Sequence, residues 1–154
     1  MQGFDTPEHA AMNGFPDKYC RVVASRVEGD DAYVLLDTGS PGQPYLYGVN
    51  CERSNGRWFE GSSGNGGGWS VTDVTVGAGT WSLWDDAPAD ADRVRAAFNG
   101  EVFETPVLEG AYLFVWWRQP NLPDMAPTVT AVRISGEWVE QLDWRSIFWS
   151  RAQR

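Results

Sequence analysis

The chain has 154 residues, of which 42% are hydrophobic and 14% aromatic, so it is too apolar to be disordered and folds as one domain or two small lobes. Its formal charge of −9 at pH 7 opposes binding to nucleic acids and to anionic membrane surfaces. No segment has the roughly 18 apolar residues of a spanning helix, and residues 1–13 lack the pattern of a signal peptide. We therefore expect a soluble, cytoplasmic protein, although a secreted protein numbered without its signal peptide would show the same pattern.

The N-terminal segment predicts one short helix. Thr6 is a suitable N-cap, Pro7 fits the first helical position, and Asn13-Gly14 end the helix. A helix this short needs a sheet to pack on, and we expect it to dock on the first strands. His9, the single histidine, is expected on the surface of this helix rather than in a catalytic triad.

The next segments predict a β-meander. Strands at Tyr19–Val27 and Ala32–Leu36 flank a turn, and the alternation from Tyr45 to Cys51 predicts a strand with one buried face. At the turn that follows, a two-residue loop places Cys51 opposite Glu60, whereas a three-residue loop places it opposite Phe59. We favour the second register because it pairs two apolar residues.

Gly61–Gly68 is the strongest change of composition in the chain, and it predicts a loop or a linker between lobes. It lacks the Lys-Ser/Thr pair of a phosphate-binding loop, and an extended segment follows it instead of a helix. The corresponding division is a helix and meander over 1–68 and a sandwich over 69–154, with a single domain as the alternative.

The second half predicts further antiparallel strands at Val71–Val76 and Thr80–Trp84, and hairpins after them. A turn at Asn99-Gly100 pairs Ala96 with Phe103 and Val94 with Thr105, and a turn at Ser135-Gly136 pairs Val132 with Val139. The apolar run Ala111–Trp117 predicts a central strand covered on both faces, and Asp143 begins a predicted short C-terminal helix.

These elements predict a mostly β protein. Its N-terminal short helix and β-meander are expected to pack on a C-terminal antiparallel β-sandwich, whose strand rhythm from Thr80 onward resembles an immunoglobulin-like domain. The cysteine and tryptophan spacing of that family is missing, so the resemblance concerns architecture alone.

The polar residues do not form a recognisable catalytic or metal-binding motif. Cys20 and Cys51 are interpreted as free thiols, with a disulfide as the alternative, and they have too few companions for a zinc site. We predict no metal and no cofactor. The candidates for calcium ligands are the carboxylates of an acidic cluster, Asp85, Asp86, Asp90 and Asp92. The simpler interpretation of this cluster is a solvated turn.

Nine tryptophans exceed what a domain of this size usually needs for its core. Exposed aromatic side chains anchor protein partners or stack on sugars. Four aromatic residues bracket the glycine-rich segment, three before it and one after it. The predicted binding residues are Tyr45, Tyr47, Trp58 and Trp69; the alternative is that these rings pack the core and stack on arginines.

Three segments resemble small uncharacterised β-rich proteins of high-GC bacteria: Thr6-Pro7-Glu8 through Gly14-Phe15-Pro16, Gly56-Arg57-Trp58, and Tyr112–Trp117. This resemblance implies no particular activity.

The sequence thus favours a non-catalytic binding module that uses exposed aromatics on a β scaffold. Its partner is an unknown protein, a small molecule or a carbohydrate, without nucleic acid or membrane, and the protein is a monomer or homodimer. One alternative is a small β-pocket enzyme of isomerase or cyclase type with a carboxylate acid or base. Another is an acidic inhibitor or immunity-type protein that neutralises a basic partner.

Overall fold

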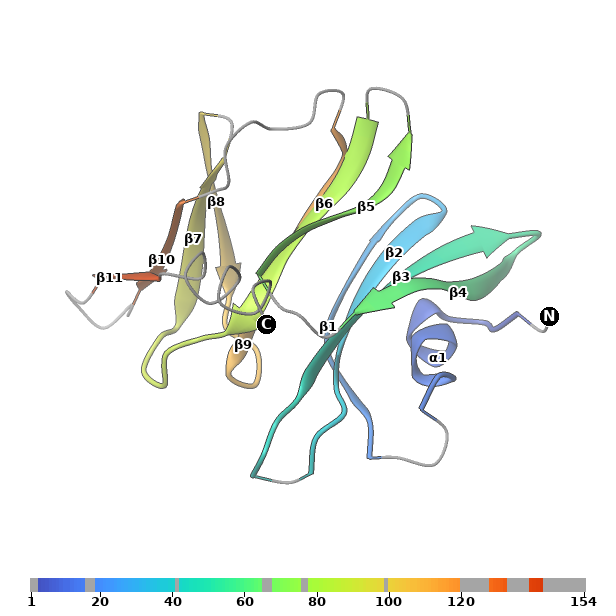
Figure 1. Ribbon diagram of the computed structural model, residues 1–154, viewed down its shortest axis with the longest axis horizontal. Helices are drawn as coiled ribbons and strands as arrows, with labels where there is room; N and C mark the ends of the chain where they lie inside the picture. The colour runs from blue at the N-terminus through green and yellow to red at the C-terminus, as the bar shows by residue number, and fades with distance from the viewer. Residues whose placement is uncertain are drawn as a thin grey trace, which may run out of the picture. The chain divides into compact units, whose positions relative to one another are not determined.

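The computed structural model describes residues 3–15, 19–40, 42–64, 68–75, 78–98, 100–119, 128–132 and 139–142 (Figure 1). The described residues are mostly β, as the sequence predicts, and they form antiparallel sheets with one short helix at the N-terminus. The chain divides into two compact units, Met1–Gly67 (unit 1) and Gly68–Arg154 (unit 2). Within the described residues, no helix has the length and apolar character needed to cross a membrane.

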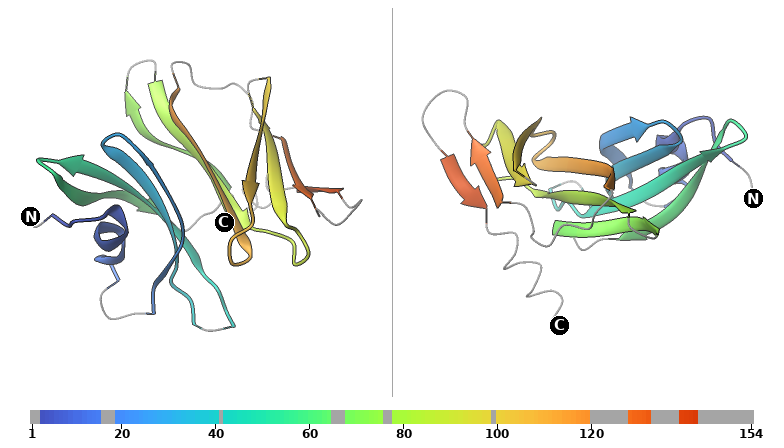
Figure 2. Two further views of the ribbon diagram at one scale, coloured as in Figure 1. Left: turned by 180° about the vertical axis from the view of Figure 1, so that it is seen from behind. Right: turned by 90° about the horizontal axis from the view of Figure 1, so that it is seen from above.

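Unit 1 is a four-stranded antiparallel meander with the helix on one face (Figure 2). The strands lie side by side in chain order, and the helix crosses all four of them. The elements are α1 (Pro7–Met12), β1 (Arg21–Glu28), β2 (Asp31–Asp37), β3 (Leu46–Ser54) and β4 (Arg57–Gly64).

The predicted helix is confirmed, together with its cap. The Thr6 hydroxyl oxygen accepts a hydrogen bond from the His9 backbone N–H at 3.2 Å, and Pro7 occupies the first turn. His9 is exposed, whereas Ala10 and Ala11 are fully buried against the sheet. Small alanine side chains let the helix approach the strands closely, which explains why six residues suffice when tertiary packing supplies the stability.

The helix-side face of the sheet carries the core of unit 1. Side chains alternate across a strand, so every second residue of β2 and β3 faces α1. The buried members of this core are Ala10, Ala11, Ala32, Val34, Leu36, Val49, Cys51 and Trp58. The hairpin predicted between β1 and β2 is confirmed, with Glu28 opposite Asp31 and Gly29 in the left-handed region.

The favoured register of the β3–β4 hairpin is wrong. Cys51 lies opposite Glu60, and the turn has two residues, Asn55 and Gly56, with φ of 53° and 75°. Two left-handed residues match the right-handed twist of the flanking strands, so this turn outweighs the apolar pairing. Trp58, and not Phe59, supplies the apolar side chain on the helix side, opposite Arg53.

The glycine-rich segment contains less loop than predicted. β4 continues to Gly64, and the next strand begins at Gly68, so both ends of Gly61–Gly68 are extended. The pairing register of β3 with β4 shifts between Val49, which lies opposite Ser63, and Cys51, which lies opposite Glu60. Two steps along β3 thus match three along β4, which marks a bulge in β4. A Cβ at Gly61 would lie 2.9 Å from the Asn50 carbonyl oxygen, which is why glycine suits the bulge.

Unit 2 has two antiparallel sheets, ordered β5-β6-β9 and β11-β10-β7-β8. Their strands are β5 (Gly68–Thr75), β6 (Ala78–Asp86), β7 (Arg93–Phe98), β8 (Glu101–Pro106), β9 (Ala111–Gln119), β10 (Thr128–Val132) and β11 (Val139–Leu142). Both predicted hairpin registers are confirmed, with Ala96 opposite Phe103 and Val132 opposite Val139.

The position predicted for the apolar run Ala111–Trp117 is wrong in one respect. β9 pairs only with β6 among the described strands, so it lies at the edge of its sheet and not at the centre. Residues 111–114 are nevertheless buried on both faces. An unbroken apolar run reports burial of the side chains, which is independent of how many strands pair with the backbone. The C-terminal helix predicted from Asp143 lies outside the described residues.

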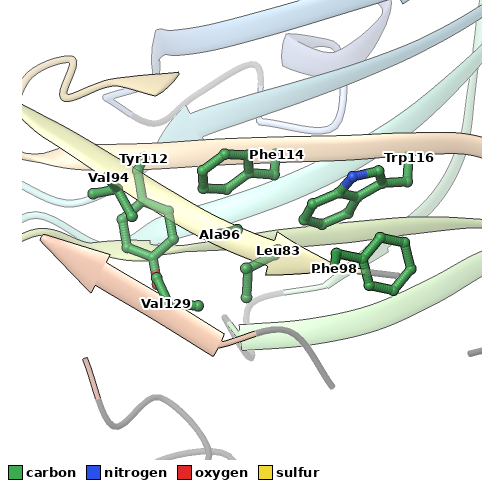
Figure 3. Packing of buried hydrophobic residues seen from close by; sticks show 8 residues of the cluster. All are labelled: Leu83, Val94, Ala96, Phe98, Tyr112, Phe114, Trp116 and Val129. Atoms are coloured by element: carbon green, nitrogen blue, oxygen red, sulfur yellow. The ribbon is translucent and has the colours of Figure 1, made fainter. Parts of the chain in front are cut away.

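The core of unit 2 draws side chains from both sheets (Figure 3). Trp116 stacks on Phe114, with ring centroids 5.5 Å apart and planes 9° from parallel. Its ring centroid also lies 4.6 Å from that of Phe98 and 5.5 Å from that of Phe103, which it meets edge-on. The full buried cluster is Leu83, Val94, Ala96, Phe98, Tyr112, Phe114, Trp116 and Val129.

Candidate binding site at one end of unit 1

The structure describes the side chains of three of the four aromatic residues predicted to bind a partner, and one of the three, Trp58, is buried. Tyr45 is 51% exposed and immediately precedes β3, and Tyr47 is half-buried on the helix side of β3. Trp58 is only 5% exposed and belongs to the core of unit 1. Trp69 lies on β5 in unit 2, and its side chain is outside the described residues. The structure thus places Tyr45 and Tyr47 two positions apart at one strand end.

Trp58 is buried for identifiable reasons, which corrects its expected role as an exposed contact. The backbone of Phe4 pairs with that of Trp58 through two hydrogen bonds of 2.9 and 2.8 Å, so the N-terminal segment covers the edge of β4. The Arg53 guanidinium lies over the indole, 5.3 Å from the ring centroid. Trp58 therefore packs in the core of unit 1.

Phe15 is a member of the site that sequence patterns did not indicate. Its ring meets Tyr47 edge-on, with centroids 5.0 Å apart and planes at 76°. The Ser63 hydroxyl contacts the Tyr47 hydroxyl oxygen at 3.5 Å. Tyr19, 47% exposed, lies two residues before β1 at the same end of the sheet. We call Phe15, Tyr19, Tyr45 and Tyr47 the aromatic end of unit 1.

Asp37, at the end of β2, holds the loop that carries Tyr45. Asp37 is 3% exposed, and its carboxylate accepts hydrogen bonds from the backbone N–H groups of Gly39 at 2.9 Å and Tyr45 at 3.0 Å. The Arg21 guanidinium donates to the same carboxylate at 3.1 Å. Tyr45 is therefore presented on an ordered loop, which lowers the entropy lost when a partner binds.

The electrostatics of Asp37 agree with this structural role. Desolvation raises the pKa of its carboxyl group, but the hydrogen bonds from Tyr45 and Gly39 and the pairing with Arg21 outweigh it. The pKa consequently lies below its ordinary value. The carboxylate is charged at neutral pH and fully engaged, so it acts as a structural acceptor.

The loop from Thr38 to Tyr45 is closed by its own backbone. Gln43 N–H donates to the Ser40 carbonyl at 2.9 Å, and Thr38 N–H donates to the Tyr45 carbonyl at 2.8 Å. A Cβ on Gly39 would lie 2.0 Å from the Gln43 carbonyl oxygen. Only glycine permits this approach of two backbone segments.

Gly39→Ala should therefore open the loop that holds Tyr45. We expect the free energy of unfolding to fall by about 1–3 kcal/mol, because a backbone carbonyl cannot move aside as a flexible side chain does. Urea denaturation measures the loss, and amide exchange at Tyr45 reports the opening. Gly64→Ala is the control, since a Cβ there meets nothing within 4 Å; equal effects of the two substitutions would contradict the role of Gly39.

The two cysteines are free, as favoured from the sequence, and Cys51 is fully buried. Burial, with the negative charges of Glu60 and Glu8, raises the pKa of the Cys51 thiol to about 12. Burial and the charge of Asp37 raise the pKa of Cys20 as well. Both thiols are protonated at neutral pH, which disfavours their use as nucleophiles.

The acidic residues considered as calcium ligands are not brought together. Within the part of the chain that the structure describes, no group of three metal-ligating side chains occurs. Asp85 accepts a hydrogen bond from the Asp86 backbone N–H at 2.8 Å, whereas Asp90 and Asp92 follow in the exposed segment before β7. This arrangement agrees with a solvated turn.

Comparisons with protein-family models, with curated protein sequences and with solved structures find no match to the chain. Its function is therefore argued from the chemistry of the aromatic end.

Proposed function

We propose that the protein is a non-catalytic binding module and that the aromatic end of unit 1 is its contact surface. The observation that carries the proposal is the exposure of Tyr45 on a loop that Asp37 and Arg21 hold in place. Rigid tyrosines offer a large apolar area and a polar hydroxyl at low entropic cost, and they are frequent anchors of interfaces.

The charge state of Asp37 favours binding over the enzyme alternative. A carboxylate that exchanges protons at neutral pH needs a pKa raised toward 7. The pKa of Asp37, the buried carboxylate of this site, is instead lowered by its hydrogen bonds. A held, charged carboxylate organises a surface and does not shuttle protons.

We further propose that unit 2 is an immunoglobulin-like sandwich that serves as a scaffold. Its connections from β6 to β7, from β8 to β9 and from β9 to β10 each pass between the two sheets. A three-stranded sheet made of the first, second and fifth strands, opposite a four-stranded sheet, agrees with a Greek-key arrangement of this type.

The test is a nuclear magnetic resonance titration of the isotope-labelled full chain with two separate probes, a six-residue arginine peptide and maltohexaose. We expect one probe at least to shift the amide signals of Phe15, Tyr45 and Tyr47. Tyr45→Ala should abolish most of that response while changing stability by less than about 0.5 kcal/mol, because the side chain is exposed.

Val102→Ala is the matched control, because Val102 is 72% exposed on β8 in unit 2. It should leave the titration unchanged. No response at the aromatic end with either probe, or a response that Tyr45→Ala leaves intact, would overturn the proposed site.

A further inference from the structure

We propose that the aromatic end binds an arginine or lysine side chain of a basic protein partner, with Glu60 as the counter-charge. This inference rests on the proposed function and names the chemistry of the ligand that the same surface takes.

Glu60 lies on the helix side of β4, and its carboxylate approaches the segment that carries Phe15. It lies opposite Cys51, which faces α1 in the same core cluster that Tyr47 borders, and its charge acts on the Cys51 thiol. A Cβ on Gly14 would lie 3.3 and 3.4 Å from the two Glu60 carboxylate oxygens. Gly14 immediately precedes Phe15, so the Glu60 carboxylate lies near the backbone that carries the Phe15 ring, and that ring contacts Tyr47.

Glu60 has no cation of its own among the residues that the structure describes, unlike three aspartates of unit 1 that form ion pairs. Asp5 pairs with Arg57, Asp30 with Arg53, and Asp37 with Arg21. Among the residues that the structure describes, Glu60 makes no ion pair, and its side chain is exposed. A negative charge without an ion-pair partner thus lies near the segment whose Phe15 ring contacts the half-buried Tyr47.

The cost of covering this charge distinguishes between ligands. A neutral ligand that covers Tyr47 and Glu60 removes water from a carboxylate without replacing its interactions, which is unfavourable. A guanidinium or ammonium group compensates that carboxylate and is also attracted to the tyrosine faces. The net charge of −9 steers a basic partner toward the protein over longer distances.

The experiment measures binding of the six-residue arginine peptide by calorimetry to the full chain and to two variants, Glu60→Gln and Glu52→Gln. Each variant removes one negative charge, and Glu52 is exposed on the neighbouring strand, on the opposite face of the sheet from Cys51. We expect Glu60→Gln to weaken binding about fivefold or more and Glu52→Gln less than about twofold. Raising the salt concentration from about 50 to 300 mM should weaken binding to the parent chain.

Three outcomes decide the matter. Equal weakening by both variants indicates general attraction to an acidic protein and overturns the inference. A response of the aromatic end to maltohexaose, with none to the peptide, also overturns the inference but leaves the proposed function intact. Failure of both probes overturns both proposals. Thermal melting of each variant verifies that the exposed substitutions leave the fold unchanged.

Discussion

Trp116→Ala should destabilise unit 2 by about 3–5 kcal/mol, because truncating a buried indole removes its packing and leaves a cavity. Trp116 packs against three rings that come from three strands, Phe98 on β7, Phe103 on β8 and Phe114 on β9. Since β7 and β9 belong to different sheets, the indole joins the two layers (Figure 3). A loss of this size is a large part of the stability of a small domain.

Urea denaturation followed by far-ultraviolet circular dichroism measures this effect. Val102→Ala is the control in the same unit, because its exposed side chain should contribute less than about 0.5 kcal/mol. A loss below about 1 kcal/mol for Trp116→Ala would contradict the packing described here.

Asp37→Ala should lower the free energy of unfolding by about 2–4 kcal/mol and release the loop that holds Tyr45. The substitution leaves the N–H groups of Gly39 and Tyr45 without an acceptor and removes the partner of Arg21. Arg21 remains partly exposed to water, which limits the penalty for that side chain. Asp30→Ala, which breaks the exposed pair with Arg53, is the control and should cost at most about 1 kcal/mol.

The pH dependence of Asp37 separates its charge from its shape. Its pKa is lowered in the folded protein, so its contribution is complete above the unfolded value of about 3.9 and is lost as the pH falls through the folded pKa. Asp37→Asn retains one acceptor but cannot titrate. The stability difference between the parent chain and Asp37→Asn should therefore stay constant from pH 7 to about 5 and shrink below about pH 4. Denaturation midpoints across this range test the sign; a difference that grows on acidification would contradict it.

The candidate site was only partly predictable. Tyr45 and Tyr47 follow from their strand pattern, because alternation shows which residues share a face. Phe15 comes from the segment after α1 and Glu60 from β4, and only the packing of this segment on the sheet brings Phe15 to Tyr47 and Glu60 to Gly14. The burial of Trp58 does not follow from the sequence, because an aromatic residue near a glycine-rich segment is equally compatible with exposure and with burial under the helix.

What the sequence by itself determined is local: the helix at Pro7–Met12 with its Thr6 cap, the turn between β1 and β2, and the hairpin registers of β7–β8 and β10–β11. Capping, turn conformation and side-chain alternation act over a few residues, so nearby residues encode them. Tertiary structure alone decided that β9 lies at a sheet edge, that Trp58 is buried, and that Asp37 joins Arg21 to Tyr45. These features depend on contacts between residues distant in the chain, whose free energies appear only when the strands and the helix pack together.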